Sequence, residues 1–501
     1  MLWTSSEAQE IDRLSSQVYG IPSLSLMEEA GLKIYHFALR QWKPYSHFVV
    51  LAGSGNNGGD ALVVARYLHE AKFSVDCFDL SDGRETEERK HQRLELEKQG
   101  FMLKPFAKGA FQIYTKKDLV VIDGLLGIGL KGALRPGLVM DCLKAAAALK
   151  PKVVVAIDLP SGLDADAWQQ DAPLLSATHT ISFGELKAVH VAEPSSRHCG
   201  SVARVPLAFA EEAIVQVMAK RKIELMHSTK VPKLADLWTF LPKDAHKYDR
   251  GHVLAIGGSP GKVGAILMAA QAAMKAGAGW VSVAPMSEIF APAWTREFTY
   301  ESFALEGEID TKALREFIVN RKVKALLIGC GTMETPLTRP VLITIVELQK
   351  ELKLKVIFDA GALANIIPLA KGLRFDPQLT LLTPHPGEWK RLHRDEELQS
   401  PDQISDLEPA IAELGKAGFS AIYKSASPIV LTPGKSIFLS LGDNRLARAG
   451  SGDILAGLIL GLAATPHSLH EIAAVAQNML ARASSLENHS LSPLQVLDKI
   501  L

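Results

Sequence analysis

Short apolar runs and longer amphipathic stretches alternate along most of the chain. In the first half the apolar runs predict strands at Phe48–Ala52, Ser74–Phe78, Leu119–Ile122, Val153–Ile157 and His179–Phe183. In the second half they predict strands that include His252–Ile256, Val281–Ala284, Ala325–Ile328, Val356–Phe358, Leu379–Leu382, Ala421–Tyr423 and Ile429–Leu431. The stretches between them predict helices, for example at Ala61–Ala71, Glu85–Gln99, Gly264–Ala276 and Pro409–Ala417. This alternation is typical of an α/β protein whose parallel sheets are covered by helices.

The strand pattern is interrupted between about Lys220 and Lys247. There the segment MHSTKVPKLADLW is irregular and carries turn residues, and the pattern restarts with GHVLAIGGS. We therefore expect two α/β domains, residues 1–220 and 225–501. Within the first, Glu85–Lys98 carries so many charges that it predicts a solvated surface helix.

Composition narrows the classes of partner. The chain has 501 residues, of which 47% are hydrophobic and 22% charged, as in a packed soluble protein of two or three domains. Its net charge of zero argues against a nucleic-acid partner and against a polybasic membrane surface. A nucleotide ligand is not excluded, because such a ligand is bound locally. The longest apolar stretch, Ile454 to Ala464, is too short to span a bilayer and predicts a buried helix.

The cysteines and the N-terminus bear on the cellular compartment. Cys77, Cys142, Cys199 and Cys330 are scattered without C-x-x-C spacing, which argues against a zinc site or a disulfide framework. The N-terminus lacks a basic segment followed by an apolar core, so no signal peptide is visible. We therefore expect a cytoplasmic protein.

The stretch GSGNNGGD, residues 53–60, lies between an apolar strand and a predicted helix. A helix N-terminus offers free N–H groups and a partial positive charge to an anion, and glycines allow close backbone approach and positive φ. The stretch ends in Asp60, where a common phosphate loop would have Lys followed by Ser or Thr. Asn56, Asn57 and Asp60 add oxygen ligands that suit a hard cation. A purely structural glycine turn is the alternative, but so flexible a loop is costly to order without a ligand.

Two further carboxylates end strands. Asp123 lies in VVIDGLLGIGLKG, and Asp158 lies in VVVAIDLPSGLDAD, which also contains Ser161. Ligands of open α/β sheets bind at the carboxyl ends of the strands, so these three strand ends are expected to converge on one crevice. For either Asp taken alone, a helix cap or a turn is the structural alternative.

Together these motifs resemble the YjeF N-terminal domain family over roughly residues 5–215. The characterised enzymes of that family are NAD(P)H-hydrate epimerases, which interconvert the R and S forms of a reduced nicotinamide that has added water at C6. The resemblance implies a Rossmann-like three-layer α/β/α domain and a potassium ion bound by Asn57, Asp123 and Ser161. It implies that the hydrate is bound by Asn56, Asn57, Gly58, Gly59, Asp60, Gly127, Ile128, Gly129, Leu130, Lys131, Gly132, Ala133 and Asp158.

Within that site we expect Asp123 to perform acid/base chemistry, because a carboxylate can relay a proton to or from the C6 hydroxyl. Ala61 stands where the family often has Gly, a change that a helix tolerates. Some relatives of this domain are binding scaffolds, but this chain keeps its polar strand ends, which favours an enzyme.

Glycine-rich or polar loops also follow strands in the second half. They are GGSPGKVGA at residues 257–265, LLIGCGT at 326–332, TPHPGEW at 383–389 and ARAGSGDILAGLILGL at 447–462. The first is not a Walker loop, because no G-K-[ST] closes it. In the last, glycines and Asp453 begin a long apolar helix, which offers N–H groups and a dipole to a phosphate, with a carboxylate beside it. Capping by Asp453 and a structural role for His385 are the alternatives.

These loops resemble the YjeF C-terminal family of ADP- or ATP-dependent NAD(P)H-hydrate dehydratases, which are ribokinase-like α/β/α proteins, over roughly residues 225–500. The resemblance implies that Ala265, Gly331, His385 and Asp453 contact the hydrate. It implies that Lys424, Ser425, Ala426, Ser427, Pro428 and Gly452 contact the adenine nucleotide. Three family motifs are altered here: one ends in Met333, one has Gly361 in place of its second Asp, and one has Ser425 in place of Gly.

The two resemblances imply a bifunctional enzyme that repairs hydrated NADH and NADPH, known as NADHX and NADPHX. The epimerase supplies the S form, Asp453 acts as base on its C6 hydroxyl, and the terminal phosphate of ADP is transferred to that oxygen. Elimination then restores NADH or NADPH and releases AMP and phosphate. Magnesium is expected with the nucleotide. ADP and ATP both remain open as donors, with ADP usual among bacterial members.

Two other functions remain as alternatives. One is a ribokinase-like small-molecule kinase fused to a nucleotide-binding module, against which TPHPGE argues, because it matches the dehydratase pattern. The other is a nucleotide-binding protein with an inactive site. Family members often form homo-oligomers, and we expect neither a nucleic-acid nor a membrane partner.

Overall fold

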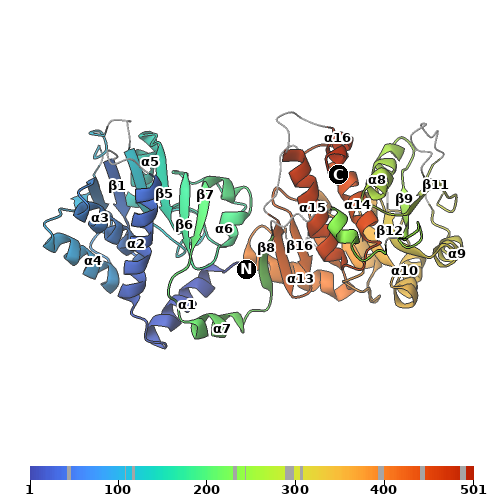
Figure 1. Cartoon of the computed structure of the whole chain (residues 1–501), viewed down its shortest axis with the longest axis horizontal. Coiled ribbons are helices and arrows are strands. Elements are labelled where there is room, and N and C mark those ends of the chain that lie inside the picture. The colour runs from blue at the N-terminus through green and yellow to red at the C-terminus, as the bar shows by residue number, and fades with distance from the viewer. Residues whose placement is uncertain are drawn as a thin grey trace. The chain divides into compact units, whose positions relative to one another are not determined.

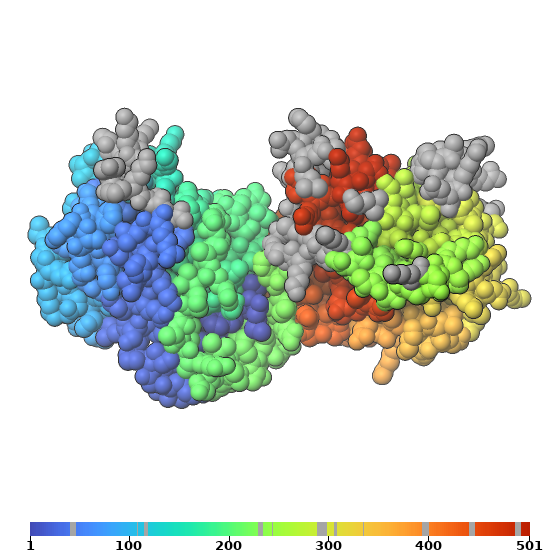
Figure 2. All heavy atoms as spheres, in the orientation of Figure 1, coloured from blue at the N-terminus to red at the C-terminus, as the bar shows by residue number. Residues whose placement is uncertain are grey.

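The computed structural model describes residues 1–41, 47–107, 109–114, 119–228, 234–242, 244–287, 298–304, 308–333, 335–392, 400–439, 446–485 and 492–500. The chain forms two compact units. The first comprises Met1–Lys222 with Asp402–Ile404, and the second comprises Ile223–Pro401 with Ser405–Leu501. The first unit is drawn mainly in blue to green and the second mainly in green to red (Figures 1 and 2). Residues 229–233 and 243 of the predicted linker lie outside the described residues.

The first unit is built on a seven-stranded parallel sheet. Its strands are β1 His47–Ala52, β2 Ser74–Asp79, β3 Lys104–Pro105, β4 Leu119–Gly124, β5 Val153–Ile157, β6 His179–Phe183 and β7 Ser201–Val205. They lie in the order β3-β2-β1-β4-β5-β6-β7, and each neighbouring pair is parallel. The order reverses between β1 and β4, and such a switch point leaves a crevice at the carboxyl ends of the two strands.

Helices cover both faces of this sheet, because its central strands are apolar on both sides. The helices are α1 Ser5–Gln17, α2 Ser23–Gln41, α3 Asn56–Glu70, α4 Glu87–Lys98, α5 Leu138–Ala148, α6 Ala188–Val191 and α7 Glu211–Met218. Phe48 and Val50 of β1 pack with α2, α3 and α4, whereas Val49 and Leu51 pack with α5. Successive side chains of a strand point to opposite faces, which produces this division.

The second unit is built on a ten-stranded mixed sheet. Its strands are β8 Glu224–Ser228, β9 His252–Gly257, β10 Trp280–Pro285, β11 Thr299–Tyr300, β12 Val323–Ile328, β13 Lys355–Phe358, β14 Thr380–Leu382, β15 Ser420–Tyr423, β16 Ile429–Thr432 and β17 Lys435–Leu439. Their order is β11-β10-β9-β12-β13-β14-β15-β16-β17-β8. Strands β11 to β15 are mutually parallel, and β16 is antiparallel to both of its neighbours. The order reverses between β9 and β12, which creates a second switch point.

The apolar core of the second unit lies under α8, α14 and α15. Its helices are α8 Val263–Lys275, α9 Thr311–Arg321, α10 Arg339–Leu352, α11 Ile366–Leu369, α12 Pro386–Trp389, α13 Ile404–Ala417, α14 Ser451–Leu462, α15 Leu469–Ser485 and α16 Pro493–Asp498. The predicted buried helix corresponds to α14, in which all residues from Ile454 to Leu462 are buried. None of the described helices is both long and apolar enough to cross a membrane.

The strands predicted from the sequence are all present, and the two α/β sandwiches confirm the predicted fold class. Three details differ. The linker contains β8, a strand whose weak apolar pattern is stabilised by pairing with β17. Helix α3 begins at Asn56 rather than near Ala61, and α13 begins at Ile404, so that Pro409 lies inside it.

Candidate functional site

The first unit contains a cavity of about 490 Å³ at the switch point between β1 and β4. Segments that are far apart in the sequence meet on its wall, including the start of α3, the loop after β4 and the residues that follow β5 and β6. Predicted hydrate-binding residues on the wall are Asn56, Asn57, Asp60, Gly127, Ile128, Gly129, Leu130 and Asp158. The volume lies in the range of small-molecule sites.

The glycines of GSGNNGGD serve close packing. A Cβ atom on Gly58 would lie 2.0 Å from the carbonyl oxygen of Gly53, and one on Gly53 would lie 1.9 Å from that of Leu125. Gly53 and Gly58 both have ordinary negative φ, so the expectation of positive φ is wrong there, whereas that of close approach is confirmed. Gly58 and Gly59 are buried within α3 and do not line the cavity.

The loop is held by Arg89, a residue that sequence reasoning placed on a solvated surface helix. Arg89 is fully buried. Its Nε donates to the carbonyl oxygen of Gly53 at 2.5 Å, and its guanidinium forms ion pairs with Asp79 and Glu85. The surface interpretation is therefore wrong for this residue, because a run of charges does not reveal which member finds buried partners.

Asp123 lies at the end of β4, fully buried and not on the cavity wall. Its carboxylate accepts hydrogen bonds from the N–H of Ser161 (2.8 Å), the hydroxyl of Ser161 (2.6 Å) and the N–H of Leu125 (3.3 Å). Burial raises the pKa of Asp123, and these hydrogen bonds oppose the rise. A carboxylate held in this way suits a fixed ligand better than a group that exchanges protons with a molecule in the cavity.

The residues predicted to bind potassium offer a suitable donor set. Asn57 has a buried Nδ2 with no hydrogen-bond partner within the described residues. Its Oδ1 lies 3.1 Å from where a Cβ of Gly127 would be, so the amide faces the loop that follows β4. Together with the Asp123 carboxylate and the Ser161 hydroxyl, this amide provides the oxygen atoms that a hard cation prefers.

Asp158 follows β5 and is ion-paired with Lys187, which sequence reasoning did not single out. Lys187 is 1% exposed, and its Nζ donates to Asp158 Oδ1 (2.8 Å), Phe183 O (2.9 Å) and Ser182 Oγ (3.2 Å). Asp158 has a φ of 65°, and its carbonyl oxygen lies 2.7 Å from His190 Nε2. The available signal was the lysine shortly after the strand at His179–Phe183, but its partner is 29 residues away.

Asp60 also faces the cavity, from the second turn of α3. Its carboxyl group has no hydrogen-bond partner in the part of the chain that the structure describes. Burial, followed by the negative charges of Asp158 and Asp12, raises the pKa of Asp60 well above its usual range. The cavity therefore combines an ion-paired carboxylate with a carboxyl group that favours its protonated form.

Besides Gly58 and Gly59, three further predicted hydrate-binding residues, Lys131, Gly132 and Ala133, do not line the cavity. Lys131 forms an ion pair with Asp166 at 2.6 Å, and the N–H of Gly132 donates to Asp164 at 3.0 Å. These contacts order the end of the loop that carries Gly127 to Leu130.

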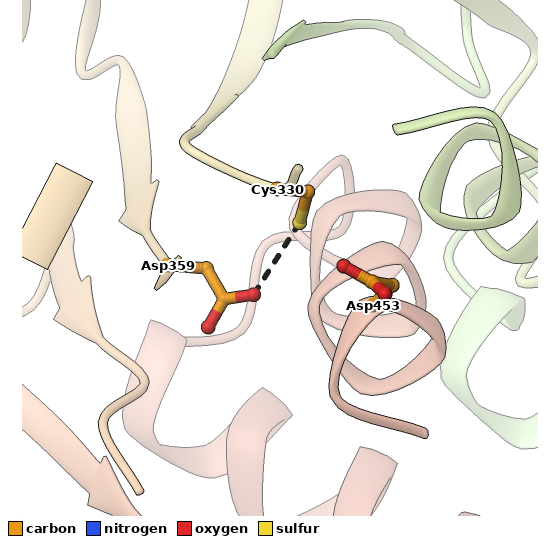
Figure 3. A group of neighbouring side chains, drawn as sticks. All are labelled: Cys330, Asp359 and Asp453. Atoms are coloured by element: carbon orange, nitrogen blue, oxygen red, sulfur yellow. Dashed lines mark hydrogen bonds between the residues drawn. The ribbon is translucent and has the colours of Figure 1, made fainter. Parts of the chain in front are cut away.

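In the second unit, three strand-end and helix-start side chains come together (Figure 3). Cys330 follows β12, Asp359 follows β13, and Asp453 lies in the first turn of α14. One ligand atom from each lies within 4.8 Å of the others, and the Cys330 thiol donates to Asp359 Oδ2 at 3.4 Å. The second switch point thus carries the acidic residue that the sequence singled out.

Asp453 occupies the positive end of a buried helix. Gly450 caps α14 with a φ of 96°, a conformation that glycine adopts readily, and the helix starts at Ser451. Burial, followed by the charge of Asp359, raises the pKa of Asp453 to about 6. The carboxyl group is therefore poised to act as a base near neutral pH.

Asp359 forms a buried ion pair with Lys424 at 2.8 Å. Thr383 Oγ1 also donates to its Oδ1 at 2.5 Å, and Glu388 lies 3.9 Å from the same ammonium. Burial opposes ionisation of Asp359, but the charge and hydrogen bond of Lys424 outweigh it, so its pKa is lowered. Burial lowers the pKa of Lys424, but the charges of Asp359 and Glu388 and the hydrogen bond to Asp359 together outweigh burial, so the pKa is raised.

The group of Cys330, Asp359 and Asp453 does not suit a resident metal ion. The Asp359 carboxylate is already neutralised by Lys424. Burial and the neighbouring carboxylates raise the pKa of the Cys330 thiol well above its usual range, whereas a metal ligand must be the thiolate. Magnesium would accordingly enter with nucleotide phosphates rather than through these side chains.

The structure brings the predicted residues of the second site together in two groups. A Cβ on Gly331 would lie 3.0 Å from the Cβ of Ala265, and a Cβ on Gly452 would lie 3.5 Å from Lys424 Nζ. His385 caps α12, where its Nδ1 accepts from the N–H of Gly387 at 3.0 Å, so it has at least a structural role.

The altered family positions lie in local structures that accommodate them. Ser425 Oγ donates to the carbonyl oxygen of Ser427 at 2.5 Å, which closes the turn from Lys424 to Pro428. Gly361 lies in a short 3-10 helix, Ala360–Leu363, directly after Asp359. Met333 is 68% exposed. The Asp359–Lys424 ion pair is present in this chain together with all three changes.

Comparison with known proteins decides the family. The family model described as YjeF-related protein N-terminus matches residues 23–189, and that described as NAD(P)H-hydrate dehydratase matches residues 253–500. A bifunctional NAD(P)H-hydrate repair enzyme from Moorella thermoacetica is 32% identical over 490 residues, which cover 92% of this chain and 88% of the relative. The chain belongs to this repair-enzyme family. Both resemblances inferred from the motifs are therefore confirmed.

Other similar proteins are more distant. The bifunctional enzyme from Escherichia coli is 26% identical over 91% of this chain and 84% of its own length. A solved structure, the ADP/ATP-dependent NAD(P)H-hydrate dehydratase from Bacillus subtilis co-crystallised with ATP/Mg²⁺, is 24% identical. It covers 55% of this chain and 97% of its own, with a TM-score of 0.41.

Proposed function

We propose that this member of the repair-enzyme family carries out both reactions. Residues 1–220 interconvert the R and S forms of NADHX and NADPHX, and residues 225–501 dehydrate the S form at the expense of ADP. The products are NADH or NADPH, AMP and phosphate. The observation that supports the dehydration reaction most directly is Asp453, a partly buried carboxyl group at the start of α14 whose pKa is raised to about 6.

In the dehydratase, Asp453 removes the proton of the C6 hydroxyl as that oxygen attacks the terminal phosphorus of ADP. The N–H groups at the start of α14 and the Lys424 ammonium beside Gly452 stabilise the phosphate charge. The phosphorylated oxygen then leaves from C6 with the help of the ring nitrogen lone pair. Loss of a proton from C5 completes the double bond of NADH or NADPH.

The hydrate would lie beside Ala265, Gly331 and His385, and the nucleotide along Lys424 to Pro428 with Gly452. Gly331 and Ala265 adjoin each other, as do Gly452 and Lys424. Magnesium bound with the nucleotide would neutralise charge on its phosphates. The chain's own contribution is the Asp359–Lys424 pair, which fixes the ammonium near the helix start.

In the epimerase, the dinucleotide would enter the cavity with a phosphate at the start of α3 and its hydrated ring toward Asp60 and Asp158. Asn57, Asp123 and Ser161 would hold potassium, which would supply a fixed positive charge at this end of the sheet. The hydrogen bonds of Ser161 to Asp123 already keep these donors in place.

The proposal is tested with purified protein and a mixture of R and S hydrates. With ADP, full recovery of nicotinamide absorbance supports both activities, and a parallel reaction with ATP identifies the donor. Recovery that stops after the S form is consumed removes the epimerase. No recovery with either nucleotide would refute the dehydratase activity and leave a binding protein or a kinase as the alternatives. Formation of ADP from ATP with added sugars or vitamins would reveal a kinase.

The dehydratase rate is expected to fall at acidic pH. A general base acts only when deprotonated, so kcat/KM on the S hydrate should be level above about pH 7 and drop about tenfold per pH unit below the Asp453 pKa of about 6. Initial rates from pH 4.5 to 8.5 at saturating ADP and magnesium measure this. A profile that is flat down to pH 5 would show that Asp453 is not the titrating base.

All four cysteines are expected to resist modification in the folded protein. Cys77, Cys142, Cys199 and Cys330 are buried and unpaired, and burial raises the pKa of each thiol. A chromogenic disulfide reagent should react with almost none in buffer and with all of them in denaturant. Rapid reaction of a native thiol would contradict the buried geometry.

A further inference from the structure

The first-unit cavity holds an acid/base arrangement that differs from the one expected from sequence. We propose that Asp60 and Asp158 exchange protons with the C6 hydroxyl during epimerisation and that Lys187 positions Asp158 for this exchange. The inference rests on the epimerase function proposed above. It transfers the acid/base role from Asp123 to two carboxyl groups on the cavity wall.

Lys187 holds one oxygen of Asp158 and leaves the other for the cavity. The hydrogen bonds of the Asp158 carboxylate all reach Oδ1: from Lys187 Nζ at 2.8 Å and, more weakly, from Ser182 Oγ and Phe183 N–H at 3.4 Å. Lys187 Nζ uses its three donors on protein acceptors. Lys187 is thus a fixed counter-charge, while Asp158 Oδ2 has no hydrogen bond within the described residues and lies on a residue that lines the cavity.

Asp60 complements this carboxylate. It lines the same cavity and has no hydrogen-bond partner in the described part of the chain. Its neighbours include two like charges, Asp158 and Asp12, and burial adds to their effect in favouring its protonated form. An ion-paired carboxylate beside a carboxyl group that favours its protonated form is the usual pairing of a general base with a general acid.

Asp123 neither lines the cavity nor has a carboxylate oxygen free of hydrogen bonds. It is absent from the cavity wall, and both of its carboxylate oxygens already accept hydrogen bonds from Ser161. Asp12 is a stronger alternative candidate for the acid than Asp123. It lines the cavity, and its pKa is raised by burial and by the charge of Glu88. Asp12→Asn therefore tests the rival acid, and Asp141, which is exposed on α5 and does not line the cavity, provides the control.

The proton exchange balances without any added reactant. Asp60 gives its proton to the C6 hydroxyl, the C6–O bond breaks, and the lone pair of the ring nitrogen forms a C=N bond, which leaves an iminium ion and water. Water then adds to C6 from the opposite face, and Asp158 accepts the proton released. Proton return from Asp158 to Asp60 through water resets the pair, and the reverse direction exchanges the two roles.

The test compares Asp60→Asn, Asp158→Asn, Lys187→Met, Lys187→Arg and the rival variant Asp12→Asn with the control Asp141→Asn in the full-length chain. Conversion of purified R hydrate into S hydrate is followed by chromatography without nucleotide, and the spontaneous rate in buffer is subtracted. Dehydration of purified S hydrate by the same preparations reports the integrity of the second unit. Circular dichroism and thermal unfolding report that of the first.

We expect kcat for epimerisation to fall at least about a hundredfold in Asp60→Asn and in Asp158→Asn, with KM changed by less than about threefold. Lys187→Met should lose a comparable factor in kcat, and Lys187→Arg should regain most of it, because a guanidinium can still pair with Asp158. Asp141→Asn should stay within about threefold of the parent, and Asp12→Asn should lose less kcat than Asp60→Asn.

Other results would overturn the assignment. Near-parental kcat in folded Asp60→Asn or Asp158→Asn removes that residue from the chemistry, and a large loss confined to Asp12→Asn moves the acid to Asp12. An equal loss of kcat in Lys187→Met and Lys187→Arg, with thermal unfolding like that of the parent, would refute the positioning role of Lys187. If Lys187→Met does not fold, the arginine variant decides alone. A parent protein that does not epimerise at all refutes the proposed function rather than this assignment.

Discussion

Asp453→Asn is expected to lower the rate of S-hydrate dehydration by about 10³-fold while leaving epimerisation intact. Asparagine keeps the shape of the side chain but cannot accept the proton of the C6 hydroxyl, so phosphate transfer loses its base. Substrate binding should change little, because the amide still fits at the start of α14. Initial rates with ADP, and the affinity for the S hydrate from calorimetry, measure the two quantities separately.

A surface substitution in the same unit, Glu316→Gln, serves as the control, because Glu316 is exposed on α9. It should retain parental dehydration. Epimerisation of the R hydrate, measured on the same Asp453→Asn preparation, shows that the loss is confined to the second site. Dehydration within about fivefold of the parent would exclude Asp453 as the base.

Lys424→Met is expected to destabilise the second unit by about 3–5 kcal/mol, because it leaves the Asp359 charge buried without its partner. The Asp453 pKa should also rise, since Lys424 is a positive charge that lowers it. The acidic limb of the dehydratase profile would then move to higher pH in whatever activity remains. Urea unfolding followed by tryptophan fluorescence measures the stability.

Two further variants serve as controls for this stability prediction. Lys435→Met removes a partly exposed lysine from a 3.9 Å ion pair with the exposed Glu224 and should cost less than about 1 kcal/mol. Lys424→Met combined with Asp359→Asn removes both buried charges and should recover part of the loss, because the desolvated charge is gone. A single Lys424→Met variant as stable as the parent would show that Asp359 is not held as a buried charge.

Strand positions were predictable because each strand is a short apolar run flanked by turn residues, and this signal is local. Edge strand β8 was not predictable, since its sequence is only weakly apolar and its pairing with β17 is contributed by residues more than 200 positions away. The start of α3 was misplaced for a related reason. Gly58 and Gly59 disfavour a helix locally, but packing of α3 against Gly53 and Met27 requires residues without a side chain there.

The motifs identified from sequence alone were enough to indicate the family and the chemistry of each half. Each motif indicates a local chemical property. GSGNNGGD indicates free N–H groups, the aspartates after strands indicate oxygen ligands, and AGSGD indicates a carboxylate at a helix start. Only the tertiary structure decided which of these groups lie on the cavity wall and which are paired with other charged residues. In the tertiary structure Asp123 does not lie on the cavity wall, whereas Asp60 and Asp158 do. The fold also buried Arg89 behind the glycine loop and paired Lys187 and Lys424 with distant carboxylates. The state of a buried charge depends on which partner the fold brings within hydrogen-bond distance, and that partner is not encoded by neighbours in the sequence.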